Sequence, residues 1–350
     1  MGRPLYFHHP VCLEHDPSAL ADRRSRRSPI GPGHPDTPER LVVLERELRE
    51  RDWLGFERRE APAASEDELA LVHTQALVAS IRELCEAGGG AIDADTYVGE
   101  PSYRAALHAA GSACAATRAL LSGETRLAFA GVRPSGHHAE PARAMGFCLF
   151  NNVAVAAALA IAELGAKRVF VLDWDVHHGN GTAEAFRRRS DVLFASIHQS
   201  PLYPGTGPLS DAGSGEGEGY TINLPVPPGS EEEEWLSLIE HVIVPAASAF
   251  APDLVLVSAG FDAHREDPLA SARLEAESFA EMARRVRALA AHAGAPVGVV
   301  LEGGYAPGAL AASAIAALTA FAGDEQPRSA APEAMLTSRA AAQVGHYWPL

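Results

Sequence analysis

The sequence predicts an α/β fold: a single domain with a mostly parallel central sheet of about eight strands, flanked by helices. Two observations support this fold class. Short apolar runs rich in Val, Ile and Leu recur along the chain, as in strands that are buried on both faces of a parallel sheet. Stretches of helical character lie between these runs, and such alternation is typical of a parallel sheet with helices on both faces.

Six of the apolar runs are expected to form strands. Four of them, RVFVLDWD, VLFASIH, LVLVSAGFD and VGVVLE, are the most strongly apolar, and LAFAGV and YTINLPV are further candidates. In chain order, the six expected strands span residues 127–132, 168–175, 192–198, 220–226, 254–262 and 297–302.

Helices are expected between and after these strands. The Ala-rich segment 151–164 is apolar on most faces, which predicts a largely buried helix. Segment 231–250 opens with four glutamates, whose charge suits the positive end of a helix dipole. Segments 274–292 and 307–321 complete this set. The first 120 residues are expected to be mostly helical, with Thr37 as an N-cap and Pro38 as the first residue of one helix.

We expect one catalytic domain, residues 1–322, followed by a tail, residues 323–350, that contains a short helix. The chain has 350 residues, 47% of them hydrophobic, which is enough for a sizeable core and excludes a largely disordered chain. Segment 18–38 is rich in Arg, Ser, Pro and Gly, and is expected to be a solvated surface loop.

Composition also excludes several classes of protein. A formal net charge of −16 argues against direct nucleic-acid binding, which requires basic patches. No run approaches 18 uninterrupted apolar residues, and the N-terminus does not resemble a signal peptide, so we expect a cytoplasmic protein without a membrane span. The four cysteines (Cys12, Cys85, Cys114 and Cys148) are far apart, which predicts buried reduced thiols.

The segment DWDVHHGNG, residues 173–181, carries the strongest functional signal. It continues an expected strand, in which side chains alternate with a period of two, so Asp173, Asp175 and His177 tend toward one side. Open α/β sheets place their ligands at this carboxyl end of a strand. Two carboxylates and an imidazole converging there would repel and desolvate one another without a cation. The motif therefore indicates a divalent metal site, with a hydrogen-bonded strand end as the structural alternative.

A further acid, Asp262, follows the expected strand LVLVSAG, again at its carboxyl end. Together with Asp175 and His177 it gives three ligands and leaves a fourth position open, as in catalytic rather than structural zinc sites. Oxygen and nitrogen ligands without a thiolate also suit Fe²⁺ and Co²⁺, so the identity of the metal stays open.

Two more motifs follow strand ends. His137 and His138 lie in RPSGHHAE; beside a metal, one of them can take a proton from a water molecule and pass it to a leaving amine. In LEGGY, two glycines allow close backbone approach, and the hydroxyl of Tyr305 is suited to act as an oxyanion donor. Each motif alone is weak evidence, but beside the metal motif both indicate a hydrolase site.

Five segments, RPSGHHAE, GFCLFNN, DWDVHHGNGT, SAGFDAH and LEGGY, resemble in this order the motifs of zinc-dependent deacetylases. This family comprises histone deacetylases, acetylpolyamine amidohydrolases and acetoin-utilisation proteins. The resemblance runs from about Tyr6 to Phe321 and implies an arginase/deacetylase-like fold. Asn180, where class I enzymes have Asp, makes the chain similar to class II and bacterial histone-deacetylase-like enzymes.

The resemblance implies a role for each matching residue. Asp175, His177 and Asp262 match the zinc ligands of the family. His138 matches the histidine that acts as general base and then as general acid. Tyr305 matches the tyrosine that polarises the substrate carbonyl.

Further residues match positions around this centre. His137 matches the histidine that assists electrostatically, with Asp173 as its carboxylate partner. Asn180 stands at the position where class I enzymes have an Asp as the partner of the histidine that matches His138. This difference leaves the pH profile of the reaction open, but not the type of reaction. Arg40 matches an arginine near the internal cavity of the family.

A substrate tunnel and a structural potassium ion are also implied by the resemblance. Gly146, Phe147 and Tyr203 match the tunnel walls, although Phe usually stands at the position of Tyr203. Two flat rings suit a linear methylene chain. The implied potassium ligands are the side chain of Asp173, the main-chain oxygens of Asp175 and His177, and Ser196 and Ile197.

The expected reaction is hydrolysis of an N-acyl amide, with an acyl-lysine peptide or protein, or an acetylated small amine, as substrate. Leu269 matches a rim position that is Glu in the polyamine-selective enzyme, and its apolar side chain favours acyl-lysine over acetylpolyamine. Asp93, Asp95 and Glu100 argue the other way, because they would supply negative charge at the mouth. Some polyamine-type relatives close their site by dimerising, so a homo-oligomer also stays open.

Two other function classes are compatible with parts of this pattern. A ureohydrolase of the arginase type shares the sheet topology but needs more carboxylates to bridge two manganese ions, whereas Gly179 and Asn180 follow the second histidine pair here. A catalytically silent acyl-lysine-binding module is the non-enzyme alternative. The presence of every expected catalytic residue disfavours it.

Overall fold

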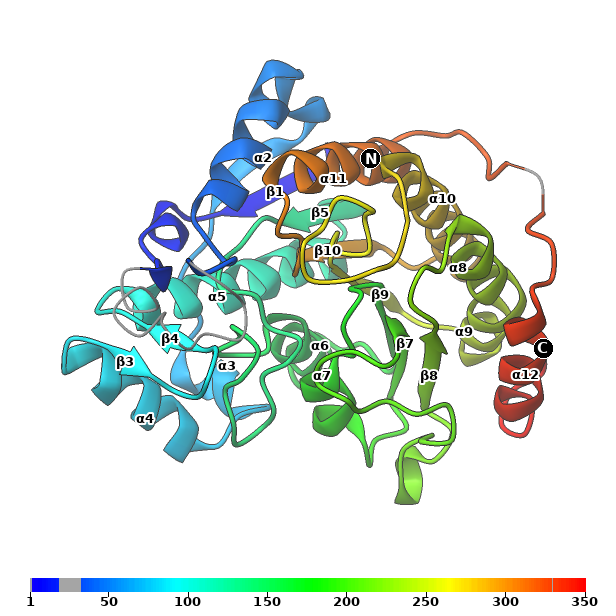
Figure 1. The fold of residues 1–350 in the computed structure, drawn as a ribbon, viewed down its shortest axis with the longest axis horizontal. Coiled ribbons are helices and arrows are strands. Elements are labelled where there is room, and N and C mark those ends of the chain that lie inside the picture. Colours follow the sequence, from blue (N-terminus) through cyan, green and yellow to red (C-terminus); the bar gives the residue numbers. More distant parts are fainter. Residues whose placement is uncertain (1, 19–32, 329) are drawn as a thin grey trace.

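Eight parallel strands form the central sheet, in the order β2-β1-β5-β10-β9-β6-β7-β8 (Figure 1). The structure is a computed structural model and describes residues 2–18, 33–328 and 330–350. It confirms the predicted α/β class and its sheet of about eight strands. The strands are Leu5–His8 (β1), Glu57–Glu60 (β2), Leu127–Ala130 (β5), Val169–Asp173 (β6), Val192–Gln199 (β7), Thr221–Val226 (β8), Leu254–Ala259 (β9) and Val297–Leu301 (β10), with Gly90–Ala91 (β3) and Tyr97–Val98 (β4) forming a separate antiparallel pair.

Two strands of the sheet, β1 and β2, were not expected from the sequence. All four side chains of β1 are buried, whereas β2 has the sequence ERRE and exposes most of its side chains at the edge of the sheet. A strand at an edge needs only main-chain pairing on one side, here with β1, so it lacks the apolar pattern of a central strand.

Helices cover both faces of the sheet, and two apolar clusters fill the space between them. Helices α5, α6 and α7 contribute to the cluster on one face, and α2, α8, α9, α10 and α11 to the cluster on the other. Helices α3 and α4 pack beside α5 and α6 in a smaller cluster. The helices are Glu39–Glu50 (α2), Glu66–Ala70 (α3), Gln75–Glu86 (α4), Ser102–Leu121 (α5), Asn152–Ala162 (α6), Asn180–Phe186 (α7), Glu232–Leu238 (α8), Val244–Phe250 (α9), Ala276–Ala293 (α10), Pro307–Ala322 (α11) and Met335–Val344 (α12).

The helix expected at 231–250 is interrupted. A π-helical turn, Ile239–Ile243, separates α8 from α9, and Pro245 lies in the first turn of α9. Proline has no amide hydrogen to donate within a helix, so the regular ladder of hydrogen bonds cannot continue through it. The glutamates do begin α8, where Glu231 and Glu234 form a capping box. Helix α2 begins at Glu39, one residue later than expected.

Residues after α11 return to the body of the domain. Helix α12 packs on α8, where the hydroxyls of Ser237 and Thr337 lie 2.8 Å apart, and the indole of Trp348 donates to the carbonyl of Gly219 at 2.7 Å. Most of segment 18–38, expected to be a surface loop, lies outside the described residues. All four cysteines are buried and free, as predicted. In the part of the chain that is described, no helix has the length and hydropathy needed to cross a bilayer.

Candidate active site

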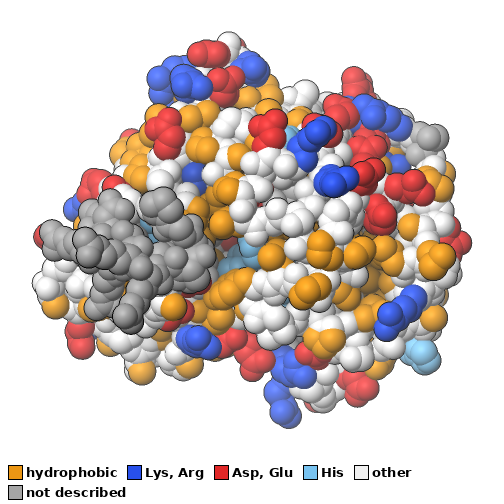
Figure 2. Space-filling model, in the orientation of Figure 1, with side chains coloured by type: hydrophobic (Ala, Val, Ile, Leu, Met, Phe, Trp, Pro, Cys, Tyr) orange, Lys and Arg blue, Asp and Glu red, His pale blue; other side chains and the backbone are white. Residues whose placement is uncertain are grey.

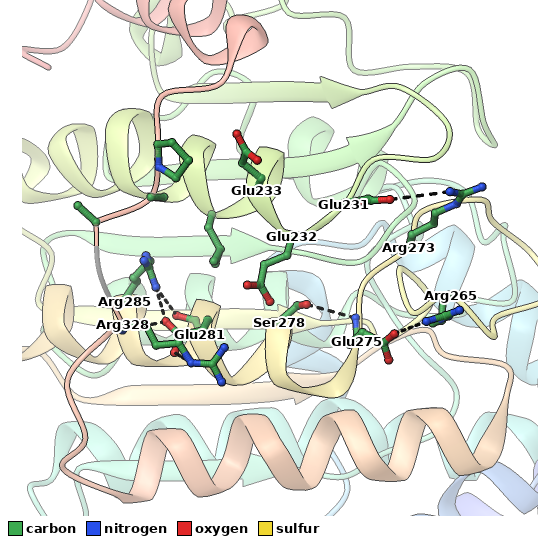
Figure 3. A pocket seen from close by; sticks show the side chains of 14 residues that line it. Glu231, Glu232, Glu233, Arg265, Arg273, Glu275, Ser278, Glu281, Arg285 and Arg328 are labelled. Atoms are coloured by element: carbon green, nitrogen blue, oxygen red, sulfur yellow. Dashed lines mark hydrogen bonds and ion pairs between the residues drawn. The ribbon is translucent and has the colours of Figure 1, made fainter.

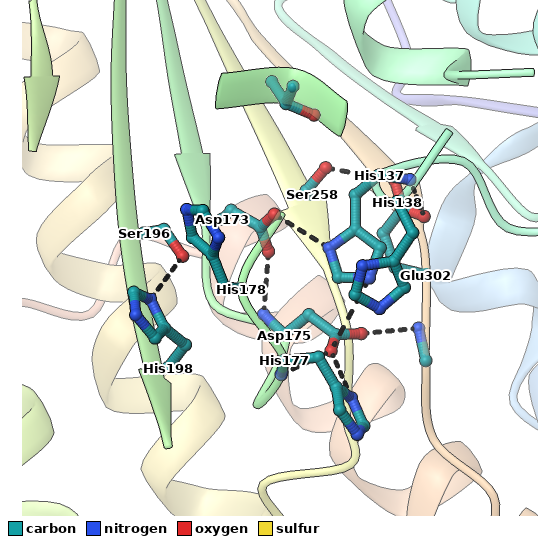
Figure 4. A network of polar contacts seen from close by, with 12 residues as sticks. His137, His138, Asp173, Asp175, His177, His178, Ser196, His198, Ser258 and Glu302 are labelled. Carbon is teal, nitrogen blue, oxygen red and sulfur yellow. Dashed lines mark hydrogen bonds and ion pairs between the residues drawn. The ribbon is translucent and has the colours of Figure 1, made fainter. Parts of the chain in front are cut away.

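Four loops, following β5, β6, β9 and β10, meet at the carboxyl-terminal edge of the sheet (Figure 4). These four strands are neighbours at the centre of the sheet, so their carboxyl ends bring together residues that are far apart in the sequence. The predicted residues at these strand ends therefore converge on one site. In Figure 2 a hollow on the face of the molecule has histidine atoms at its floor.

Asp175, His177 and Asp262 form a compact group of potential metal ligands. Their donor atoms all lie within 4.8 Å of one another, and all three side chains are buried. Nδ1 of His177 lies 3.0 Å from Oδ1 of Asp175 and 3.1 Å from Oδ2 of Asp262. Among the residues that the structure describes, no other three His, Cys, Asp or Glu side chains meet this spacing.

The electrostatics of this group favour a cation. Burial, together with the charge of Asp175, raises the pKa of Asp262. Although burial acts against it, the hydrogen bonds and charges of the two aspartates raise the pKa of His177 to about 10. Two carboxylate oxygens and one imidazole nitrogen form a donor set that Zn²⁺, Fe²⁺ and Co²⁺ accept, so these residues fit a divalent metal.

Two glycines, Gly260 and Gly303, press against these ligands. A Cβ at Gly260 would lie 2.1 Å from Oδ2 of Asp175, and one at Gly303 would lie 2.1 Å from Oδ2 of Asp262. The amide of Gly303 also donates to Oδ2 of Asp175 at 2.8 Å. The glycines of LEGGY thus allow the backbone to approach the carboxylates closely, because they have no side chains.

His138 lies beside the metal group, held by Asn180. Nδ1 of His138 lies 2.8 Å from the amide oxygen of Asn180, and the amide nitrogen of Asn180 donates to Oε1 of Glu140 at 2.8 Å. Burial, together with the positive charges of His137 and His177, lowers the pKa of His138 well below its usual value. His138 is therefore a neutral imidazole near neutral pH. Glu140 was not singled out from the sequence.

His137 is held differently from its neighbour. Its Nδ1 lies 2.9 Å from Oδ2 of Asp173, whose other oxygen accepts the amide hydrogen of Asp175 at 3.0 Å. Although burial acts against it, the charges of Asp175 and Asp173 raise the pKa of His137 well above its usual value. The two adjacent histidines thus have opposite tendencies toward protonation.

A buried carboxylate that sequence reasoning missed, Glu302, supports this pair of histidines. Its Oε2 accepts the amide hydrogens of Gly136 at 2.7 Å and His137 at 3.1 Å, and its Oε1 accepts the hydroxyl of Ser258 at 3.0 Å. Its position at the end of β10, in LEGGY, was visible in the sequence. Its partners were not, because they come from the loop after β5 and from strand β9.

Tyr305 lies in the loop after β10, next to Arg40. The guanidinium carbon of Arg40 lies 4.7 Å from the centre of the Tyr305 ring, and Arg40 is paired with Asp36 at 2.7 Å. Burial raises the pKa of Tyr305 well above its usual value, so its hydroxyl keeps its proton and remains a donor. Asp36, which also pairs with Arg133, was not singled out from the sequence.

A cavity of about 230 Å³ leads to these residues. The rings of Phe147 and Tyr305 meet edge to face with centroids 5.7 Å apart, and the ring of Tyr203 meets that of His138 in the same way at 5.1 Å. Phe147 is buried, whereas Tyr203 is 36% exposed and stands at the mouth. The cavity is lined by Asp95, His138, Gly146, Phe147, His177, Leu202, Tyr203, Leu269 and Tyr305.

The rim of this cavity combines apolar and acidic side chains. Leu269 lies there, as does Leu202, which was not predicted. Of the three acids expected at the mouth, Asp95 lines the cavity, whereas Asp93 and Glu100 do not. Burial and the neighbouring Asp93 raise the pKa of Asp95 to about 6.

The residues expected to hold potassium belong to strands β6 and β7 and to the segment that follows β6. Asp173 and Ser196 are direct partners in the pairing of β6 with β7, and both are buried. The hydroxyl of Ser196 lies 2.9 Å from Nδ1 of His198, and Ile197 lies between these two residues in β7. Asp173 and Ser196 are thus neighbours across two paired strands, whereas the potassium ligand set stays a prediction.

A second cavity, of about 910 Å³, lies elsewhere, between α8 and α10, and contains none of the predicted site residues (Figure 3). Most of its charged side chains pair with one another: Arg273 with Glu231, Arg265 with Glu275, and Arg285 with the buried Glu281 at 2.6 Å. Paired charges on an open groove do not provide the converging donors found at the sheet edge.

Comparison with known proteins agrees with this site. Residues 34–321 match the family model described as histone deacetylase domain. The chain is 41% identical to a "Probable deacetylase" of Archaeoglobus fulgidus, covering 89% of each chain, and 40% identical to the "Histone deacetylase-like amidohydrolase" of Pseudomonas aeruginosa, covering 87% of this chain and 82% of that one. Among solved structures, the HDA15 HD domain matches with a TM-score of 0.90 and 34% identity, covering 99% of this chain and 96% of that one.

Proposed function

The chain belongs to the histone deacetylase family, and from this premise we propose that it is a metal-dependent amidohydrolase that removes an acetyl or other short acyl group from the side-chain amine of acyl-lysine. One observation supports this proposal above all others. The three clustered donors Asp175, His177 and Asp262 adjoin a narrow cavity in which neutral His138 and protonated Tyr305 face the same space.

Asp175, His177 and Asp262 would hold the metal, with Zn²⁺ as the preferred ion and Fe²⁺ or Co²⁺ as alternatives. When bound, such an ion supplies a Lewis acid for the amide carbonyl and lowers the pKa of a water molecule toward neutrality. The backbone around the ligands is already fixed, because Val176 donates to Asp262 at 2.9 Å and Gly303 to Asp175 at 2.8 Å.

His138 serves as the general base and then as the general acid in this proposal. Asn180 accepts the hydrogen on Nδ1, which leaves the lone pair of Nε2 free to take a proton from water. The proton then passes from Nε2 to the leaving amine. His137, held by Asp173, adds positive charge beside the reacting carbonyl.

Tyr305 donates its hydroxyl hydrogen to the oxyanion that forms as water attacks. A donor prepositioned for developing charge stabilises the transition state more than the substrate. Phe147 and Tyr203 contribute apolar ring surface along the cavity, which suits the methylene chain of lysine. Gly146 allows His138 to approach, since a Cβ there would lie 2.5 Å from Cδ2 of His138.

The choice between the two substrate classes depends on the residues at the rim of the cavity. Leu269 offers no counter-charge for a second ammonium group, which favours acyl-lysine. Asp95 lines the same cavity and favours the alternative substrate, an acetylpolyamine. A carboxylate at the mouth also suits a peptide, because it can accept main-chain amide hydrogens, so we retain acyl-lysine as the first choice.

A structural potassium ion is part of the proposal. Asp173, Ser196 and Ile197, with the main-chain oxygens of Asp175 and His177, offer only oxygen ligands, the type that a hard monovalent cation prefers. We also retain residues 1–322 as the catalytic domain and residues 323–350 as its tail.

The test is turnover by the metal-reconstituted protein of an acetyl-lysine peptide and of N-acetylputrescine, with Zn²⁺, Fe²⁺ and Co²⁺ in parallel. We expect efficient cleavage of the peptide, and none by D262A, which lacks one ligand. Efficient cleavage of the diamine alone would overturn the preference for acyl-lysine. Peptide binding without turnover with any of the ions would indicate a catalytically silent module.

A further inference from the structure

The peptide unit that joins Gly304 to Tyr305 is held at both ends. Its carbonyl oxygen, on Gly304, accepts a hydrogen bond from Nε of Arg40 at 2.6 Å. Its amide hydrogen, on Tyr305, is donated to Oδ2 of Asp267 at 2.6 Å. A cation thus faces the negative end of the peptide dipole and a carboxylate faces the positive end, an arrangement that strengthens both hydrogen bonds.

The local sequence explains why such a hold is needed. Gly303 and Gly304 have no side chains that could fix the turn, and Gly304 adopts a φ of 121°, a conformation that other residues rarely adopt. Gly303 is fixed by Asp175 and by a hydrogen bond from the amide of Phe261 to its carbonyl at 3.0 Å. The backbone amide of Tyr305 depends on Asp267.

Asp267 also reaches the rim of the cavity. Its second oxygen, Oδ1, accepts the amide hydrogen of Leu269 at 3.0 Å, and its own amide is bonded to the carbonyl of His264 at 2.9 Å. Asp267 as a whole residue is 7% exposed, so water offers little competition for these bonds. One carboxylate thus joins two segments that both line the cavity, at Leu269 and at Tyr305.

We propose that Asp267 is a positioning residue, which acts with Arg40 on the Gly304–Tyr305 peptide unit to aim the Tyr305 hydroxyl at the substrate carbonyl. The proposal rests on the proposed function for the role of that hydroxyl. The two hydrogen bonds of its carboxylate go to the backbone amides of Tyr305 and Leu269, and not to Asp175, His177 or Asp262. Its loss therefore affects kcat more than the affinity for metal.

Asp267→Asn is the informative variant. An amide has one acceptor oxygen and one donor group, so it can satisfy only one of the two amide hydrogens and opposes the other. We expect kcat on an acetyl-lysine peptide to fall about 10- to 100-fold, because a small misplacement of an oxyanion donor is enough for such a loss. Glu266→Gln, an exposed neighbour, is the matched control and should stay within about twofold of the wild type.

A double-mutant cycle with Tyr305→Phe separates positioning from a general loss of structure. If Asp267 acts through the hydroxyl, D267N should cost less than about twofold in the Y305F background. The same loss of kcat in both backgrounds, or a D267N variant with more than half of the wild-type kcat, would overturn the proposal. Where D267N does not fold, Asp267→Ser, which leaves room for a bridging water, enters the same cycle.

Hydrogen exchange tests the hold on the peptide unit without any turnover. The Tyr305 amide, followed by mass spectrometry in a fragment covering residues 302–306, should exchange at least about tenfold faster in D267N than in the wild type or E266Q. Unchanged exchange contradicts the proposal. Should the wild type cleave no acylated amine, the proposed function fails, while this measurement still decides whether Asp267 holds Tyr305.

Discussion

The side-chain oxygen of Asn180 lies 2.8 Å from Nδ1 of His138. The orientation of this amide is fixed from its other end, because its nitrogen donates to Glu140. Nδ1 of His138 must therefore carry a hydrogen, and Nε2 is left with its lone pair. A neutral amide fixes this tautomer without adding the negative charge that an aspartate would bring, and burial, with the charges of His137 and His177, lowers the pKa of His138.

Replacing Asn180 with Asp should raise the pKa of His138, because a carboxylate favours the imidazolium. His138 would then lose its free lone pair at a higher pH, and the acidic limb of the kcat/KM profile should move upward by about one pH unit. The measurement is the pH dependence of acetyl-lysine peptide hydrolysis.

The control for this change concerns the charge of Glu140, because its carboxylate would face the new carboxylate in the N180D variant. Adding Glu140→Gln supplies an amide donor at that position and removes the repulsion. The shifted limb should persist in the double variant. An acidic limb that stays in place in both variants would show that Asn180 does not tune His138.

Replacing Tyr305 with Phe should lower kcat by about 10²- to 10³-fold, as expected for the loss of one oxyanion donor. The metal ligands are untouched, so metal content should not change. Tyr347→Phe removes a hydroxyl from an exposed tyrosine and is the control. A Y305F variant with more than half of the wild-type turnover would refute the role of this hydroxyl.

Replacing Gly303 with Ala should weaken metal binding. The new Cβ would lie 2.1 Å from Oδ2 of Asp262 and 2.5 Å from Oδ2 of Asp175, so one of these buried carboxylates must move. A loss of about 10- to 100-fold in affinity is expected, measured by calorimetric titration with Zn²⁺. Gly308→Ala is the matched control, because nothing lies within 4 Å of a Cβ there. Equal affinity in the two variants would contradict the assigned ligands.

The pKa of about 6 at Asp95 predicts a pH-dependent KM. Below this pH the carboxyl is neutral; above it, the carboxylate attracts cations at the mouth of the cavity. For an acetyl-lysine peptide with a flanking lysine, KM should therefore fall as the pH rises from about 5 to 7. Asp95→Asn should remove this dependence, and a peptide with a neutral flank should show little of it. If KM still depends steeply on pH in the D95N variant, the dependence comes from another group.

The sequence was sufficient to predict the central strands and the edge at which the site forms. Buried parallel strands consist of apolar runs, and chemistry-bearing residues such as Asp175 and Asp262 follow them directly. Strand β2 could not be predicted in this way, because its stability comes from main-chain pairing rather than from its side chains.

The supporting contacts of the site were also beyond the sequence. Glu302 ends an expected apolar strand and Asp267 lies in a loop, and only the meeting of separate loops gives these two carboxylates their amide partners. The same holds for Glu140, whose contact with Asn180 joins the loop after β5 to the first residue of α7. Motif spacing predicts which residues take part in the reaction, whereas the residues that hold them depend on tertiary contacts.

The anchoring of α12 has a practical consequence for anyone shortening this protein. A chain cut after Ala322 would lose the partner of Ser237 and would uncover the rings of Tyr220 and Phe250, on which Trp348 packs at 5.3 and 6.0 Å. Freshly exposed aromatic surface promotes aggregation. Recombinant preparation therefore benefits from retaining the last 28 residues, even though they lie far from the reaction centre.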